Sequence, residues 1–244
     1  MSLPGLPDLR QRSREPELLD TGASSPSSVS DVEIGRSLAD LRLVNRWLGG
    51  RRRLLDAVRP HLGPGGSLLD VGCASADLPA FLLSRLETPV LAVGLDVKLA
   101  HLKDAPPLVR RVVAHVGALP FPNAAFDVVT PSLFLHHLDT EDLAPILRDL
   151  YRLARRALVV SDLHRAAVPH LFGRLVFPAL FRSPVSVHDG LVSIRRGFRP
   201  AELRSAFEEA GLPHVRIRRR FPYRLLAVAV RPEGPGATGS GTGA

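Results

Sequence analysis

An acid and a glycine at the end of a short apolar run are the first residues of this sequence that suggest chemistry. Asp70 and Gly72 close the run SLLDVG, and Asp96 follows Gly72 by 24 residues, at the end of a second apolar run. A glycine after a strand lets the backbone approach a ligand closely. An acid at the end of the next strand can accept hydrogen bonds from ribose hydroxyls. Together they predict a site for a nucleotide-like cofactor.

Strands and helices that alternate along the chain must hold these residues in place. Short apolar runs predict strands over 67–72, 90–96, 109–115, 126–132, 156–162, 214–221 and 223–230. Apolar residues at helical spacing predict helices over about 34–48, 54–62, 78–86 and 143–153. This alternation indicates a mostly parallel sheet with helices on both faces, and the last two strands read as an antiparallel hairpin.

The turn after the first strand resembles a known cofactor motif. Asp70-Val71-Gly72-Cys73-Ala74-Ser75-Ala76 is similar to acid-x-Gly-x-Gly-x-Gly, the first motif of class I S-adenosylmethionine-dependent methyltransferases, with alanine in place of the last two glycines. Residues 115–138, with LPF, FDVV and HHL, resemble the stretch through the fourth strand of small-molecule methyltransferases. The resemblance implies an α/β, Rossmann-like fold with a mostly parallel seven-stranded sheet, a C-terminal antiparallel hairpin and helices on both faces.

S-adenosyl-L-methionine is the cofactor that this resemblance implies. The alanines permit its close approach only if their φ angles stay negative. The family usually has aspartate at the end of the third strand, facing the adenine amino group; here His115 could accept that hydrogen bond through one ring nitrogen. The expected cofactor-binding residues are Asp70, Gly72, Cys73, Ala74, Ala76, Asp96, Val97, His115, Val116 and Ser132.

Several segments resemble a narrower bacterial group that is related to quinone-biosynthesis methyltransferases. These segments include PELLD (16–20), SLFLHHLD (132–139) and HDGLVSIRRGFRPAEL (188–203). Some members of the group accompany type III polyketide synthases and methylate phenolic hydroxyls. The resemblance implies O-methylation of a small aromatic, polyketide-derived or phenolic lipid metabolite, as in secondary metabolism.

Phenol methylation requires removal of a proton, and histidine titrates near neutrality. His136, His137 and His188 are therefore the candidates for the catalytic base. The alternatives are that His137 closes a turn and that Asp189-Gly190 is a structural turn. We expect no metal site.

Composition and charge narrow the class of partner. The net charge is +8, but 30 of the 32 basic residues are arginine, spread along the chain, so we expect no nucleic-acid partner. Cys73 is the only cysteine, which fits a cytoplasmic location. The apolar segment 166–181 is shorter than the roughly 20 residues of a membrane span. It could still contact lipid or a biosynthetic partner enzyme peripherally.

The chain divides into a central domain and two polar ends. We expect a disordered or extended segment over 1–30, a methyltransferase domain over 31–232 and a disordered tail over 233–244. Within the domain, helices over 31–63 precede the first strand, and a lid or substrate insertion covers about 165–199. Two other functions stay open: a degenerate, non-catalytic ligand-binding protein, suggested by Ala74, Ala76 and His115, and an RNA methyltransferase, suggested by the charge.

Overall fold

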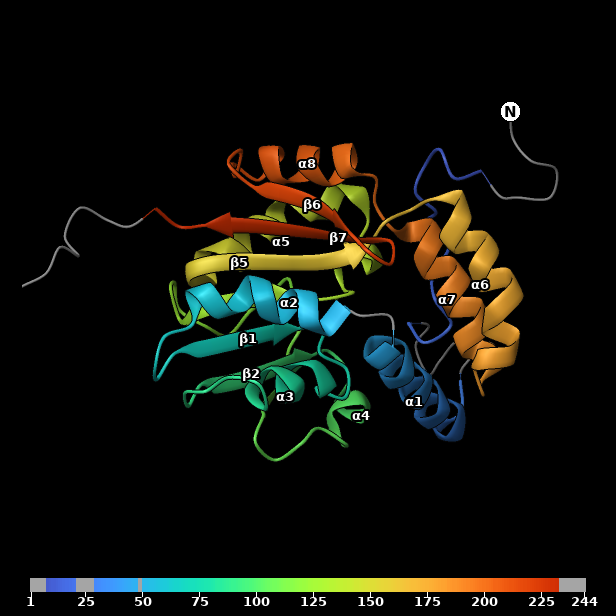
Figure 1. Ribbon diagram of the computed structural model, residues 1–244, viewed down its shortest axis with the longest axis horizontal. Helices are drawn as coiled ribbons and strands as arrows, with labels where there is room; N and C mark the ends of the chain where they lie inside the picture. The colour runs from blue at the N-terminus through green and yellow to red at the C-terminus, as the bar shows by residue number, and fades with distance from the viewer. Residues whose placement is uncertain (1–7, 21–28, 48–49, 233–244) are drawn as a thin grey trace, which may run out of the picture.

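The computed structural model describes residues 8–20, 29–47 and 50–232 (Figure 1). Predictions for 1–7, 21–28, 48–49 and the tail from 233 lie outside these residues. Residues 8–20 run mostly without regular secondary structure and lie against the rest of the chain. No helix in the described ranges is long and apolar enough to cross a membrane.

One seven-stranded sheet forms the centre of the fold, in the order β3-β2-β1-β4-β5-β7-β6. The strands are β1 (Ser67–Val71), β2 (Leu91–Asp96), β3 (Arg110–Val113), β4 (Phe126–Pro131), β5 (Ala154–Leu163), β6 (Arg216–Arg220) and β7 (Arg224–Val230). The first five pair in parallel, whereas β7 lies antiparallel to both β5 and β6. The predicted fold class, including the C-terminal hairpin, is confirmed.

Helices cover both faces of the sheet. They are α1 (Asp31–Trp47), α2 (Gly50–Val58), α3 (Asp77–Leu83), α4 (Leu99–Leu102), α5 (Thr140–Leu153), α6 (Ala167–Leu180), α7 (Pro184–Arg196) and α8 (Pro200–Glu209), with short 3-10 helices at Arg59–His61 and Leu135–His137. Leu143, Leu147 and Leu150 place one apolar side of α5 in the core, beside Leu203 and Phe207 of α8. Leu54, Leu55 and Leu82 bury α2 and α3 in a second cluster on the other face.

A separate group of helices lies beyond the carboxyl ends of the parallel strands. Figure 1 shows α1, α6 and α7 there, and α7 contacts both other helices. Pro184 opens α7, and the Ser183 hydroxyl caps it by accepting a hydrogen bond from the Val185 N–H at 3.2 Å. Asp189 and Gly190 lie inside this helix, so the predicted alternative of an Asp-Gly turn is wrong.

Strand order reverses beside β1, which has β2 on one side and β4 on the other. In open α/β sheets, ligands bind outside the carboxyl ends of the strands at such a reversal. The turn after β1 and the segment after β4 both emerge at this edge, facing α1, α6 and α7. The topology therefore directs attention to the space between the sheet and these three helices.

Candidate cofactor and acceptor site

The turn after β1 contains three residues with a left-handed backbone. Gly72, Ala74 and Ala76 have φ angles of +68°, +47° and +54°. Glycine adopts this conformation freely, whereas alanine does so at a cost of about 1–2 kcal/mol. The condition set for close approach, a negative φ at both alanines, is therefore not met. The backbone follows the path of a glycine-rich turn even where alanine replaces glycine.

Gly72 lies directly beneath an aromatic ring. A Cβ atom at this position would lie 2.3 Å from Cδ2 of Phe134, the residue that follows Leu133 at the end of the β4 turn. The N–H groups of Gly72 and Cys73 both donate to the Leu95 carbonyl, at 2.8 and 3.0 Å. A glycine is therefore required here by packing as well as by φ, and the turn is fixed to β2.

Asp96 supports the same turn from the end of β2. Its Oδ2 accepts a hydrogen bond from the Ala74 N–H at 3.0 Å, and its Oδ1 accepts one from the Lys98 N–H at 2.9 Å. Burial alone would raise the pKa of Asp96, but hydrogen bonds from His101 and Lys98 hold it below its usual value. The carboxylate is thus ionised at neutral pH, and Oδ2 keeps capacity to accept a further hydroxyl.

Asp70 is in the opposite state. It is buried between β2 and β4, and Oδ1 accepts the Thr130 hydroxyl at 3.0 Å. Burial raises the pKa of Asp70 well above its usual value, and the neighbouring Asp77 and Asp96 raise it further. The side chain therefore favours its neutral form until a cation lies beside it.

His115 cannot bind in the predicted way. Its Nδ1 accepts a hydrogen bond from the Gly117 N–H at 3.1 Å, so in the neutral ring Nε2 carries the proton. The free nitrogen is then a donor, which suits a ring nitrogen of adenine but not its amino group. The predicted acceptor role is wrong, although His115 does face the predicted space.

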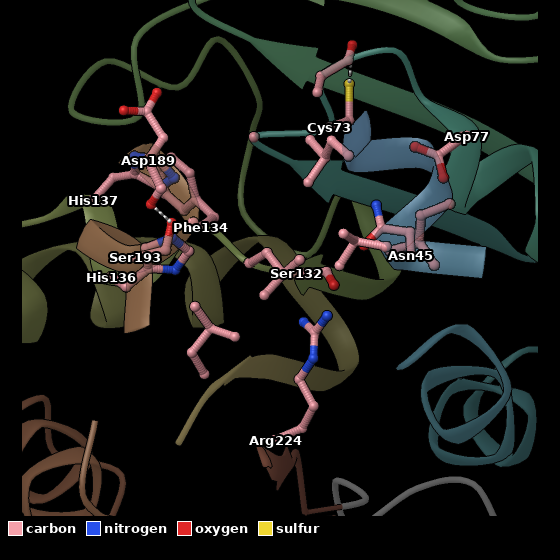
Figure 2. Close-up of a pocket in the computed structure, with 18 of the residues that line it drawn as sticks. Asn45, Cys73, Asp77, Ser132, Phe134, His136, His137, Asp189, Ser193 and Arg224 are labelled. Carbon is pink, nitrogen blue, oxygen red and sulfur yellow. Dashed lines mark hydrogen bonds between the residues drawn. The ribbon is translucent and has the colours of Figure 1, made fainter. Parts of the chain in front are cut away.

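A cavity of about 1330 Å³ joins the β1 turn to the segment after β4 (Figure 2). Single-ligand pockets usually measure about 300–1,000 Å³, so this one has room for a cofactor and a second molecule. Nine of the ten predicted cofactor residues line it. The exception is Ala76, which is fully buried below the turn. Burial, followed by the charges of Asp70 and Asp96, raises the pKa of the Cys73 thiol, so that thiol is not a nucleophile.

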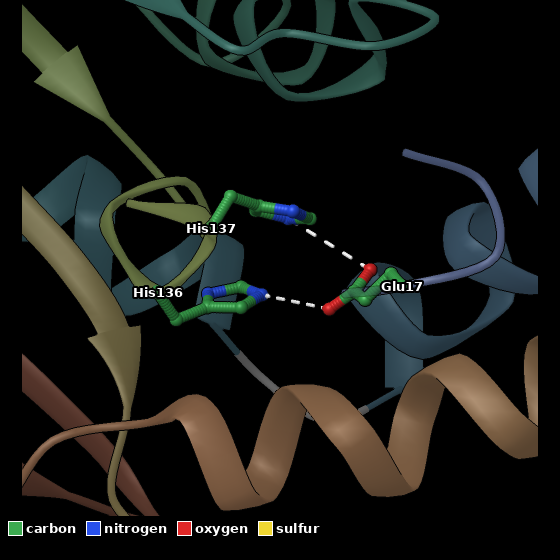
Figure 3. Close-up of side chains that lie close together, drawn as sticks. All are labelled: Glu17, His136 and His137. Carbon is green, nitrogen blue, oxygen red and sulfur yellow. Dashed lines mark ion pairs between the residues drawn. The ribbon is translucent and has the colours of Figure 1, made fainter. Parts of the chain in front are cut away.

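Two neighbouring histidines lie at the other side of the cavity (Figures 2 and 3). The His136 Nδ1 lies 2.7 Å from Asp162 Oδ1, and the His137 Nδ1 lies 2.6 Å from Asp20 Oδ2. Their Nε2 atoms both point toward the carboxylate of Glu17, at 3.5 Å for His136 and 3.9 Å for His137. Each imidazole is thus held between two carboxylates.

The carboxylates act most strongly on His136, which is only 3% exposed. Burial alone would lower its pKa, but Asp162 and Glu17 raise the pKa of His136 to about 9. Burial likewise would raise the pKa of Glu17, but His137 and His136 hold it below its usual value. The arrangement therefore stabilises positive charge between the two imidazoles and Glu17.

The segment 8–20 reaches this site because α7 anchors it. Asp189 accepts hydrogen bonds from the N–H groups of Leu18 and Leu19, at 2.7 and 3.0 Å. The Ser193 hydroxyl donates to Glu17 Oε1 at 2.5 Å. Arg196 holds the other side, donating to the carbonyls of His136 and His137 at 2.7 and 2.6 Å. Helix α7 thus positions both the acidic segment that carries Glu17 and the backbone of the two histidines.

His188 lies apart from the pair. Its Nδ1 lies 2.9 Å from Asp189 Oδ1, and its Nε2 lies 3.3 Å from Glu15. Within the described part of the chain, the residues that line the cavity include Asp189 and Gly190 but not His188. The structure therefore brings together His136 and His137 but leaves the third predicted base outside.

Comparison with known proteins finds similarity to methyltransferases. A family model described as a methyltransferase domain matches residues 69–157. A probable S-adenosylmethionine-dependent methyltransferase of Mycobacterium tuberculosis is 27% identical over 163 residues, which are 66% of this chain and 58% of the relative. An uncharacterized methyltransferase of Synechocystis is 26% identical over 184 residues, covering 72% of this chain and 81% of the relative. The chain thus spans less than two thirds of the length of the mycobacterial protein.

Solved structures share the fold at low identity. A SAM-dependent methyltransferase from Aquifex aeolicus superposes with a TM-score of 0.61 at 17% identity, over 83% of this chain and 98% of the other. The plantazolicin methyltransferase BpumL, solved with SAH, gives a TM-score of 0.64 at 13% identity, over 86% and 92% of the two chains. These matches support the class I S-adenosylmethionine-dependent methyltransferase superfamily for this chain, and the fold is the one its solved members share.

The residues of the cavity fit S-adenosyl-L-methionine, the cofactor of the similar proteins, which supplies a methyl group on a positively charged sulfur when bound. Ionised Asp96 can accept a ribose hydroxyl, and Asp70 lies at the cavity wall, where it can face the cationic amino group of the methionine moiety. The His115 Nε2–H can donate to an adenine ring nitrogen. His115 would thus offer a hydrogen-bond donor where the superfamily usually has an acceptor.

Sequence reasoning missed two of the three acids beside the histidine pair, Glu17 and Asp20. Glu17 and Asp20 belong to PELLD, which the sequence marked only as a point of resemblance. Asp162, at the end of β5, is the buried partner of His136. The available signal was the presence of two acids in an otherwise apolar five-residue segment, but nothing in the sequence placed that segment beside His136.

Proposed function

We propose that this protein transfers the methyl group of S-adenosyl-L-methionine to a hydroxyl of a small aromatic, polyketide-derived or phenolic lipid metabolite. The observation that supports this most is the single cavity that joins the β1 turn to the His136 and His137 pair. A cofactor at the turn and an acceptor at the histidines would share one cavity. That arrangement supplies the alignment that an in-line transfer needs.

The chemistry asks two things of the protein. The acceptor oxygen must line up behind the methyl carbon, so that the new O–C bond forms as the C–S bond breaks and the sulfur keeps the electron pair. The hydroxyl must lose its proton. Of the three predicted bases, His136 and His137 line the cavity. The pKa of His136 is raised to about 9, so that ring already holds a proton at neutral pH, and we propose that the hydroxyl is activated beside His137 rather than at His136 or His188.

The walls around the pair support an apolar acceptor. Phe172, Phe177 and Phe181 line the cavity together with Val168. The outer face of α6 continues this apolar surface, since Val168, Leu171 and Leu175 are exposed. We propose that the acceptor carries an alkyl or polyketide chain, and that α6 contacts lipid or a partner enzyme that presents it. A cytoplasmic location remains part of this proposal.

Cofactor binding is the first test. Isothermal titration with S-adenosylhomocysteine should show binding to the unmodified protein and about 100-fold weaker binding to Asp96→Asn, which loses the charge that strengthens the ribose hydrogen bonds. Asp104→Asn, an exposed acid that follows α4, is the matched control and should bind as the unmodified protein does. No heat with the unmodified protein at high concentration would refute the proposal.

The acceptor is tested with methyl-labelled S-adenosyl-L-methionine and a set of 5-alkylresorcinols of increasing chain length. Mass spectrometry should show products heavier by one labelled methyl group, with KM falling as the chain lengthens. Phe172→Ser should reduce that dependence on chain length. Binding of S-adenosylhomocysteine without transfer to any phenol would favour a non-catalytic ligand-binding protein. Transfer of the label to RNA would favour an RNA methyltransferase.

A further inference from the structure

Glu17, His136 and His137 form a compact set of metal-ligand types that the proposed reaction does not by itself explain. One carboxylate oxygen and one nitrogen from each imidazole all lie within 4.8 Å of one another. All three residues line the cavity, and Figure 3 shows both imidazoles facing the Glu17 carboxylate. Glu17 is separated from the histidines by more than one hundred residues, so the sequence predicted no metal site.

The outer hydrogen bonds decide which way the imidazoles face. Asp162 and Asp20 take the Nδ1 positions at 2.7 and 2.6 Å, so each Nδ1 must carry its proton. Each Nε2 is then left facing Glu17. A histidine that binds a metal almost always donates its other N–H to a carboxylate, a carbonyl or water. Here both histidines do so.

The gap on the inner side is wider than a direct ionic hydrogen bond. The Nε2 atoms lie 3.5 and 3.9 Å from the Glu17 oxygens, whereas charge-assisted N–H···O bonds measure about 2.7–2.9 Å. Ligand atoms around a tetrahedral ion at roughly 2.1 Å lie about 3.4 Å apart. The ligand atoms lie within 4.8 Å of one another, so an ion would draw them together by up to about 1.4 Å. The hydrogen bond from Ser193 to Glu17 would adjust with that movement.

We propose that Glu17, His136 and His137 bind one divalent transition-metal ion, with Asp162 and Asp20 as the outer carboxylates. Two imidazoles and one carboxylate are a donor set used for catalytic zinc and for non-haem iron, with further positions open. Because all three residues line the cavity, a hydroxyl held there could reach the ion. The catalytic role rests on the proposed function: a hydroxyl bound to the ion would release its proton to solvent more readily, leaving an alkoxide or phenolate oxygen.

The binding test uses the full chain after treatment with EDTA and dialysis. Titration with Co²⁺, followed by visible absorption, and with Zn²⁺, followed by calorimetry, should give one ion per chain. His137→Ala and Glu17→Gln should weaken binding at least 100-fold, and Asp20→Asn about 10- to 100-fold. Glu15→Gln is the matched control, because Glu15 lies in the same segment but pairs with His188 and Arg195; it should bind as the unmodified protein does.

Circular dichroism and thermal melting identify any variant that fails to fold, and His137→Ala is the variant with the most exposed of the three side chains. Absence of stoichiometric binding at about 100 μM ion, or unchanged binding in both ligand variants, would overturn the proposal.

Activity separates this inference from the proposed function. Methyl transfer that falls with EDTA and returns with Zn²⁺ or Co²⁺ would support the catalytic role, and transfer that is indifferent to EDTA would overturn that role. Stoichiometric metal binding in a protein that fails to bind S-adenosylhomocysteine would sustain the metal site while refuting the methyltransferase proposal.

Discussion

At the cofactor side of the cavity, Gly72, Ala74 and Asp96 come from two adjacent strands and are joined mainly through backbone N–H groups. At the acceptor side, Glu17, His136 and Asp162 come from segments far apart and are joined through charged side chains. The first side is built by local chain geometry. The second depends on buried charges that stabilise the fold only while each keeps its partner.

Asp162→Ala should cause the largest loss of stability, because it removes a buried carboxylate from between two positively charged groups on the acceptor side. The substitution leaves His136 and the buried Arg224 without the carboxylate beside them. Removing one partner of a buried pair costs about 3–5 kcal/mol. Urea unfolding should show this loss. Asp149→Ala, which breaks a half-exposed pair with Arg152, should cost at most about 0.5 kcal/mol; equal losses would show that burial is not what distinguishes the two sites.

Gly72→Ala, at the cofactor side, should lower the free energy of unfolding by about 3 kcal/mol. The new methyl group meets Phe134, which contributes about 1–3 kcal/mol of overpacking, and the left-handed φ adds about 1 kcal/mol. In a double-mutant cycle measured by urea unfolding, Phe134→Ala should restore the packing part but not the backbone part. Strict additivity of the two substitutions would contradict the contact.

Asp70→Asn should stabilise the protein increasingly as the pH rises. The pKa of Asp70 is raised in the folded state, chiefly by burial, so below the unfolded pKa of about 3.9 both states are protonated and no penalty exists. Between that pH and the folded pKa, ionisation of the unfolded state costs the natural protein up to about 1.4 kcal/mol per pH unit. Unfolding free energies measured at pH 5, 6 and 7 should diverge accordingly. A difference that does not change with pH would refute the buried, neutral state.

Ala74→Gly and Ala76→Gly should each stabilise the protein by about 1 kcal/mol, by relieving a left-handed alanine. Ala80→Gly, inside α3, is the control and should cost about 1 kcal/mol. Thermal melting ranks the three variants by stability, and the first two should melt above the natural protein and the third below it. Destabilisation by all three would mean that the turn gains nothing from glycine and that its alanines are not strained.

The strands and most helices could be predicted because their apolar residues repeat at the period of the element that buries them. Asp70, Gly72 and Asp96 could be predicted as one site, since consecutive parallel strands bring their ends to one edge. His115 could be placed but its role could not, because the Gly117 N–H that takes its Nδ1 is a matter of local backbone geometry. The positive φ angles of Ala74 and Ala76 could not be predicted either, since alanine rarely adopts the conformation that this turn imposes.

The sequence by itself determined the sheet, the cofactor turn and the presence of paired histidines after the fourth strand, because each depends on residues close together in the chain. Only the tertiary structure decided what faces those histidines. Asp189 on α7 fixes the backbone of Leu18 and Leu19, and this places Glu17 and Asp20 against His137. Such contacts join residues more than one hundred positions apart, and no periodicity along the chain encodes which of its many acids will be brought there.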